Sequence, residues 1–121
     1  MKFLLDTNFL MIPGKFRVDV FYELTKFGRP ECYTLDLVIE ELERIASRRG
    51  RNLGYAKLAL FLVKEKSVKI LKSKEGKADE EILKRAGDFV VCTSDRILIR
   101  KLKEKGGRIV ILKSRKYLEE A

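Results

Sequence analysis

Short apolar runs alternate along the chain with longer segments in which apolar residues recur at the helical period. Five short apolar runs predict strands, at residues 2–5, 31–35, 68–71, 89–93 and 108–112. The intervening segments predict helices, at residues 7–12, 18–27, 37–48, 53–64, 78–86 and 94–105. This alternation predicts a three-layer α/β/α sandwich around a mainly parallel five-stranded sheet. No repeat or linker interrupts the pattern, so we expect a single domain over residues 1–121.

The net charge and the residue types limit which partners and which catalytic groups the protein can have. With 27 Lys and Arg against 18 Asp and Glu, the chain has a net charge of +9, which favours a polyanionic partner such as nucleic acid. The sequence contains no histidine, which excludes a Ser-His-Asp triad, a Cys-His pair and a histidine-ligated metal. Hydrolytic chemistry would therefore have to rest on carboxylates, together with a hard metal ion.

The cysteines and the apolar runs also indicate a compartment. Cys32 and Cys92 lie far apart, in no zinc-binding spacing, and are expected to be free thiols in a reducing cytosol, with a single disulfide as the alternative. No segment approaches the roughly 20 apolar residues of a membrane span, so we expect a cytoplasmic protein. The absence of Gln and the abundance of Lys, Arg and Glu are typical of proteins from hyperthermophiles.

Four acidic residues occupy positions that the pattern makes half-buried, whereas most other acids face solvent. Asp6 and Asp95 follow predicted strands and so fall at the carboxyl edge of the sheet. Glu41 lies at the margin of the apolar stripe of its helix, and Asp79 lies within the stripe of the helix at 78–86. Both helices begin near the same edge, so we expect the four carboxylates to converge there.

Several carboxylates buried together repel one another, and a bound divalent cation removes most of that penalty. Oxygen ligands without His or Cys suit Mg²⁺ or Mn²⁺, which permits metal-assisted hydrolysis of a phosphodiester. Each acid alone has a plainer explanation. Asp6 and Asp95 could cap helices, Asp79 could favour the helix dipole, and Glu41 could lie on the surface. The four together, in a basic chain without histidine, favour a metal site.

Four segments resemble, in order, the motifs of the PIN-domain nucleases. Leu-Leu-Asp-Thr-Asn at residues 4–8 resembles their opening strand motif, and Val-Ile-Glu-Glu-Leu at 38–42 resembles their helical Glu-Leu motif. Ala-Asp-Glu-Glu-Ile at 78–82 resembles the third motif, and Val-Cys-Thr-Ser-Asp at 91–95 resembles the fourth. Taken together, the resemblance spans residues 3 to 112.

This resemblance implies a sheet of order 3-2-1-4-5 and Mg²⁺- or Mn²⁺-dependent cleavage of single-stranded RNA. It implies a catalytic and metal-binding set of four acids: Asp6, Glu41, Asp79 and Asp95. It also implies that three polar residues orient the ligands or the attacking water: Asn8, Thr93 and Ser94. One departure is Glu80, where many members have a second Asp. On the helical wheel both Glu80 and Glu81 face away from the apolar stripe, and we expect Glu80 to lie outside the metal site.

Two branches of the family fit equally well. The sequence resembles the PIN proteins that process ribosomal RNA, with their compact archaeal relatives, and it resembles the VapC toxins of toxin–antitoxin pairs. These branches imply ribosome-assembly factors or an antitoxin protein as partners. The alternative function is a non-catalytic RNA-binding PIN domain acting in ribosome assembly. A phosphotransfer hydrolase of the DxDxT kind is disfavoured, because Asn8 stands where that chemistry needs an Asp.

Basic residues predict where RNA would bind. Four arginines crowd one end of the helix at 37–48 and its loop: Arg44, Arg48, Arg49 and Arg51. Of these, Arg48, Arg49 and Arg51 are expected to contact the phosphate backbone. Further cations gather at residues 96–108 and 113–116, although for any single one a solvated surface is the simpler explanation.

Some aromatic and apolar side chains also allow two uses. Phe16, Phe27 and Tyr55 could stack bases, although packing in the core is the simpler expectation. On the helix at 53–64, three apolar side chains could pack in a homodimer: Leu58, Phe61 and Leu62. Packing in the core is again the simpler expectation for them.

Overall fold

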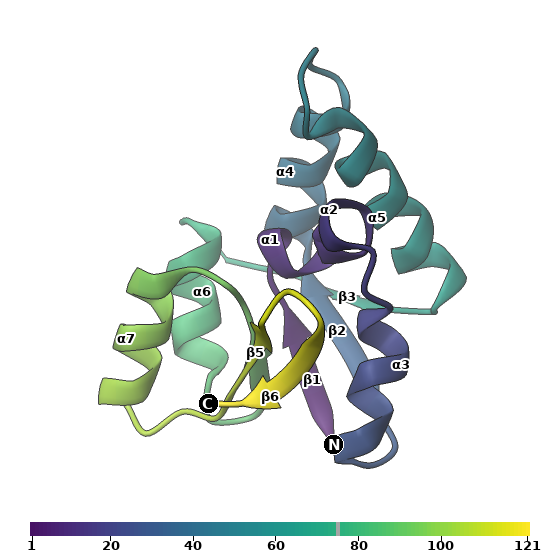
Figure 1. The fold of residues 1–121 in the computed structure, drawn as a ribbon. Coiled ribbons are helices and arrows are strands. Elements are labelled where there is room, and N and C mark those ends of the chain that lie inside the picture. The colour runs from purple at the N-terminus through teal and green to yellow at the C-terminus, as the bar shows by residue number, and fades with distance from the viewer. Residues whose placement is uncertain (75) are drawn as a thin grey trace.

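A six-stranded sheet runs through the protein, whose computed structural model describes residues 1–74 and 76–121 (Figure 1). Its strands are β1 (Lys2–Leu5), β2 (Glu31–Leu35), β3 (Lys69–Leu71), β4 (Val90–Cys92), β5 (Ile109–Lys113) and β6 (Tyr117–Glu120). The order is β3-β2-β1-β4-β5-β6, and the first five strands are parallel, which confirms the predicted order 3-2-1-4-5. The sixth strand, which the sequence pattern did not predict, pairs antiparallel with β5.

Helices cover both faces of this sheet (Figure 1). They are α1 (Thr7–Leu10), α2 (Ile12–Phe16), α3 (Val20–Leu24), α4 (Asp36–Ala46), α5 (Leu53–Glu65), α6 (Ala78–Arg85) and α7 (Arg96–Glu104), with a 3₁₀ turn η1 (Thr25–Phe27). The α6–α7 pair lies on one side and α1 to α5 lie on the other. The α4–α5 pair projects beyond the sheet, with the connecting loop at its tip (Figure 1).

The central strands are buried on both faces. Phe3, Leu4 and Leu5 of β1 have no exposed surface, and neither do Val91 and Cys92 of β4. A strand covered by helices on both sides does not alternate between apolar and polar residues, which explains the continuous apolar runs in the sequence.

Two predicted helices differ from the observed ones. The segment predicted as one helix at 7–12 forms α1 and α2, which are separated at Met11. The predicted helix stops at residue 12 and leaves Pro13 outside it. Instead Pro13 lies in the first turn of α2, where a missing backbone N–H costs nothing. In place of the helix predicted at 18–27, the structure has the shorter helix α3, which ends at Leu24 and is followed by the 3₁₀ turn η1.

Three further expectations can be compared with the structure. Cys32 and Cys92 are both free thiols, as predicted. Leu58 and Phe61, expected in the core, are 37% and 58% exposed, because α5 packs on α4 through its other side. Within residues 1–74 and 76–121, no helix has the length and hydropathy needed to cross a bilayer.

The topology creates a crevice at one place. β1 lies between β2 and β4, and the chain leaving β1 covers one face of the sheet while the chain leaving β4 covers the other. In open α/β sheets, ligands bind at the carboxyl ends of the strands on either side of such a switch point. Asp6 directly follows β1, and Asp95 follows β4 by a short loop.

Candidate active site

A cavity of about 620 Å³ opens at this switch point, and all four predicted acids line it. Asp6 comes from the end of β1, Glu41 from α4, Asp79 from the first turn of α6, and Asp95 from the start of α7. The expected convergence of the four carboxylates at the carboxyl edge is therefore present in the structure. Asn8 lines the same cavity.

Asp6 is the most constrained of these acids. It caps α1, with its Oδ1 accepting a hydrogen bond of 2.8 Å from the Thr7 N–H, and its Oδ2 accepts one of 2.8 Å from the Thr93 hydroxyl. Burial raises the pKa of the Asp6 carboxyl, and the charges of Glu41 and Asp95 add to the rise, while the hydrogen bonds from Thr93 and Thr7 oppose it. The buried position therefore disfavours the charged form of Asp6.

Asp95 uses its two carboxylate oxygens differently. Its Oδ1 caps α7 by accepting hydrogen bonds from the N–H groups of Ile97 (2.9 Å) and Leu98 (3.1 Å). Its Oδ2 accepts no hydrogen bond from the residues that the structure describes, so this oxygen is available to a ligand. The Asp95 N–H donates to the Thr93 Oγ1 over 3.1 Å, so one threonine hydroxyl connects Asp95 and Asp6.

Asn8 and Thr7 fix α1 against the other walls of the cavity. The Asn8 Oδ1 accepts a hydrogen bond of 3.0 Å from the Ser94 N–H and a longer one, of 3.5 Å, from the Thr93 hydroxyl. The buried Thr7 hydroxyl donates to the Glu41 Oε1. Sequence reasoning did not single out Thr7, although it lies between two predicted site residues.

The two glutamates after Asp79 differ from each other. Glu80 is exposed, as expected, but Glu81 is only 7% exposed, so the prediction that Glu81 faces solvent was wrong. The Glu81 Oε1 accepts a hydrogen bond of 3.3 Å from the Lys74 N–H and lies 3.5 Å from the Arg85 Nη2. Glu81 is buried because the chain leaving β3 crosses this side of α6.

That crossing segment, residues 72–74, is held at every residue. The Arg85 Nη2 donates to the Lys72 carbonyl over 2.6 Å, and the Ser73 N–H donates to the Asp36 Oδ1 over 3.0 Å. Asp36 starts α4, so the segment connects the helix that carries Glu41 with the helix that carries Asp79. These bonds fix the separation of the two helices and hence of their acids.

Cations lie at the rim of the cavity and further away. Arg44, one turn after Glu41 on α4, and Lys77, which precedes α6, both line the cavity. The three predicted RNA-binding arginines, Arg48, Arg49 and Arg51, do not line it. They are exposed in the loop at the tip of the α4–α5 pair, as Figure 1 shows.

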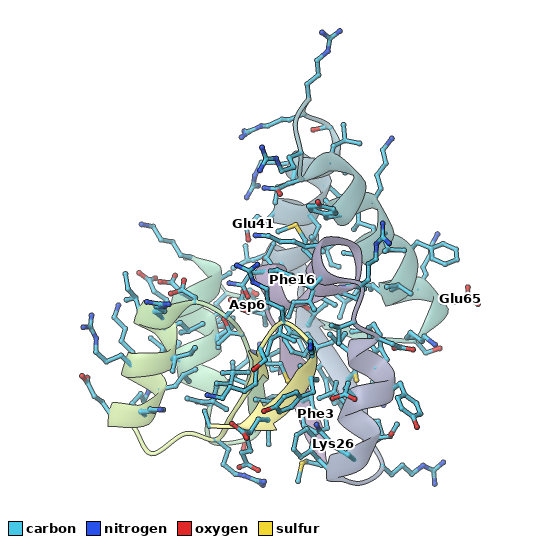
Figure 2. All side chains as sticks on the ribbon, viewed as in Figure 1. Phe3, Asp6, Phe16, Lys26, Glu41 and Glu65 are labelled. Carbon is cyan, nitrogen blue, oxygen red and sulfur yellow. The ribbon has the colours of Figure 1, made fainter. Side chains whose placement is uncertain are left out.

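The residues present fit a hydrated hard cation. In the described part of the chain, no three acidic or cysteine side chains lie close enough together to enclose a metal ion. Mg²⁺ does not need such a cage, because it keeps several waters and binds through one or two carboxylates. Asp6 and Glu41 lie close together where α1 meets α4 (Figure 2), and Asp95 presents a free oxygen to the same cavity. The donor atoms are all oxygens, which suits Mg²⁺ or Mn²⁺.

Comparison with known proteins gives a consistent result. Residues 3–115 match the family model described as a PIN-like domain. The chain is 35% identical over 128 residues to Ribonuclease VapC4 of Methanocaldococcus jannaschii, covering 98% of this chain and 95% of that protein.

Two solved structures have a similar fold. The structure of the PIN domain endonuclease Utp24 has a TM-score of 0.81 at 22% identity, covering 98% of this chain and 90% of that one. A domain of a functionally unknown protein from Methanocaldococcus jannaschii has a TM-score of 0.61 at 23% identity, covering 93% and 91% of the two chains. The family model covers nearly the whole chain and the 35% identical relative extends over almost all of it, so the chain belongs to the PIN-like domain family.

Proposed function

We propose that this protein is a ribonuclease that hydrolyses phosphodiester bonds of single-stranded RNA with the help of Mg²⁺ or Mn²⁺. The observation that carries the proposal is the convergence of Asp6, Glu41, Asp79 and Asp95 on one cavity at the switch point of the sheet. The relative Ribonuclease VapC4 supports the reaction class. The net charge of +9 of the whole chain, with these four acids included, favours a polyanionic substrate.

The four acids would hold the metal, and the polar residues around them would hold the acids. When bound, Mg²⁺ or Mn²⁺ supplies positive charge that offsets the charge developing on the phosphate and favours attack by water. Thr93 keeps Asp6 and Asp95 at a fixed separation through the two hydrogen bonds of its hydroxyl group, while Asn8 fixes the Ser94 backbone before Asp95.

Cations would guide the RNA. Arg44 and Lys77 line the cavity and would bind phosphates that neighbour the scissile one. Arg48, Arg49 and Arg51 would hold the strand farther from the cavity, on the projecting α4–α5 tip.

The protein partner would be an antitoxin or a ribosome-assembly factor. A homodimer could form through Leu58 and Phe61, which are exposed on α5. Size-exclusion chromatography with light scattering on Phe61→Lys and wild type would test the dimer.

The test of the ribonuclease is cleavage of a labelled single-stranded RNA with Mg²⁺, with Mn²⁺ and with EDTA. Wild type should cut only with metal, and Asp6→Asn, Glu41→Gln and Asp95→Asn should each lose cleavage. Glu43→Gln is the matched control, because Glu43 is exposed on the same helix as Glu41 and does not line the cavity.

Two outcomes would contradict the proposal. Cleavage that continues in EDTA would exclude the metal, and an equal loss in Glu43→Gln would exclude a specific role for Glu41. Tight RNA binding without cleavage under either metal would instead support the non-catalytic RNA-binding function.

Replacing Arg48, Arg49 and Arg51 together with Ala should weaken RNA binding and make its affinity less dependent on salt concentration.

A further inference from the structure

The turn between β5 and β6 lies at the same edge of the sheet as the acidic cavity. β1, β4 and β5 are parallel, so their carboxyl ends share that edge. Val110 pairs with Cys92, the last residue of β4, and β5 continues beyond this pair to Lys113. The turn therefore projects past the strand that leads to Asp95, toward α2, whose Phe16 lies near Arg115 (Figure 1).

The turn contacts α2 through one aromatic ring. The guanidinium carbon of Arg115 lies 5.7 Å from the centroid of Phe16, and the Lys15 Nζ lies 5.4 Å from the same centroid. Phe16, labelled in Figure 2, is half-buried. Since α2 begins directly after Met11, which lines the acidic cavity, this short helix connects the cavity to the turn.

The backbone here is strained. Ser114 and Arg115 have φ angles of 52° and 55°, and the Lys116 N–H donates to the Lys113 carbonyl over 3.0 Å, which closes a β-turn within the three-residue connection between β5 and β6. Two consecutive positive φ angles favour Asn-Gly, which the sequence does not use. Arg17, at the end of α2, also has a positive φ, of 57°. Such strain is retained most often where the side chains have a use.

Four exposed cations belong to the turn and to the end of α2 that it contacts, and we name them the turn cluster: Lys15, Arg17, Arg115 and Lys116. Among the described residues, none of the four forms an ion pair. Lys113 is left out of the cluster because it lies 4.0 Å from Glu119. Lys15 and Arg115 lie against the same ring without an ion pair to offset their repulsion, and a bound polyanion would offset it.

We propose that the turn cluster binds the phosphate backbone of the RNA strand beside the acidic cavity, as a second contact separate from the arginines at the α4–α5 tip. The proposal rests on the proposed ribonuclease function and deepens it, since it assigns the path of the substrate. The contact of Arg115 with Phe16 holds the guanidinium in place before RNA arrives, which lowers the entropy lost on binding.

The strained turn allows a sharp test. In the double variant Ser114→Asn/Arg115→Gly, the turn receives its favoured residues and loses one cation. Its Tm should rise by about 3–6 °C. Its affinity for a single-stranded RNA of about 20 nucleotides should fall by about 3- to 10-fold, with a salt slope lower by about 0.7. The single variant Ser114→Asn keeps Arg115 and should bind RNA like wild type.

Two more variants complete the design. Arg29→Ala removes one charge at the opposite edge of the sheet, before β2, and should leave affinity and salt slope unchanged. Lys116→Ala removes a cation of the cluster without changing the two central turn residues, and should weaken binding as the double variant does. If the double variant folds poorly, Lys116→Ala still tests the turn cluster.

Binding is measured by fluorescence anisotropy of the labelled RNA in EDTA, so the result does not depend on cleavage. If wild type cuts no RNA, the ribonuclease proposal fails while the anisotropy comparison still tests the cluster. If the double variant and Lys116→Ala bind as tightly as wild type, the turn is only structural and the proposal is overturned. An equal loss of affinity in Arg29→Ala would also overturn it, because net charge alone would then explain the effect.

Discussion

Replacing Thr93 with valine removes a single hydroxyl from between two acids of the cavity, with almost no change of side-chain shape. That hydroxyl donates to the Asp6 Oδ2 over 2.8 Å and accepts from the Asp95 N–H over 3.1 Å. Thr34 provides a matched reference. Its side chain is also fully buried, and its hydroxyl donates over 2.7 Å to the neutral carbonyl of Leu5.

The two substitutions should differ in cost because their acceptors differ in charge. Losing the neutral bond in Thr34→Val should lower the free energy of unfolding by about 1 kcal/mol. In Thr93→Val, the bond to an ionised carboxylate is worth about 1.5–3 kcal/mol, and the Asp95 N–H also loses its acceptor, so we expect a loss of about 3 kcal/mol.

The expected loss of stability can be followed by thermal melting in EDTA. With an unfolding entropy of about 2.1 cal/mol/K per residue, 1 kcal/mol corresponds to about 4 °C in a chain of 121 residues. Thr34→Val should therefore lower Tm by about 4 °C and Thr93→Val by about 12 °C. Thr93→Ser keeps the hydroxyl and should lose only the contribution of one methyl group, about 1 kcal/mol. Equal Tm losses for the two valine variants would refute the reasoning, because Asp6 would then not be a charged acceptor.

Three other perturbations test separate parts of the site and fold. Asp6→Asn removes a carboxylate whose pKa is raised chiefly by burial, but it also weakens the hydrogen bonds from Thr7 and Thr93. The two effects oppose each other, so cleavage should be lost while Tm in EDTA stays within about 4 °C of wild type, and a Tm loss as large as that of Thr93→Val would contradict this. Glu81→Gln should lower the free energy of unfolding by about 2 kcal/mol and reduce kcat, because α6 would be displaced. The control Glu80→Gln, at an exposed position, should change neither quantity, and equal effects of the two variants would show that the burial of Glu81 is unimportant. The Leu118 N–H is the main cause of the lowered pKa of Glu23, so the stability that this carboxylate adds is present above its usual value of 4.5 and is lost as pH falls below it. Urea titrations should therefore show wild type losing more stability than Glu23→Gln on acidification, and parallel losses would disprove the contribution.

Most of the fold could be predicted because the central strands carry a strong local signal. A strand covered on both faces must be apolar throughout, so β1 and β4 stand out from any neighbouring segment. β6 lacks this signal, since only Leu118 among its residues is buried. It forms because the edge of β5 supplies hydrogen-bond partners, and that edge lies elsewhere in the sequence.

The error at Glu81 has a related cause. A helical wheel describes only the apolar stripe of its own helix, and on that basis Glu81 faces away from the core. The burial of Glu81 comes from residues 72–74, which cross α6 after leaving β3 and donate the Lys74 N–H to its carboxylate. A side chain that receives its environment from a distant segment cannot be assigned from the periodicity of its own helix.

The acids that cap helices show why the sequence left two explanations open. Asp6 caps α1 and Asp95 caps α7, so the structural explanation of each is correct. Capping by Asp95, however, uses only one carboxylate oxygen, and the other faces the cavity without a hydrogen bond from the described residues. A cap also fixes the carboxylate at a helix start, which in a parallel sheet is the carboxyl edge where ligands bind. Capping the helix therefore places the carboxylate where the proposed metal would bind. Asp95→Asn keeps a capping oxygen but removes the charge, so this substitution separates the capping role from the proposed metal-binding role.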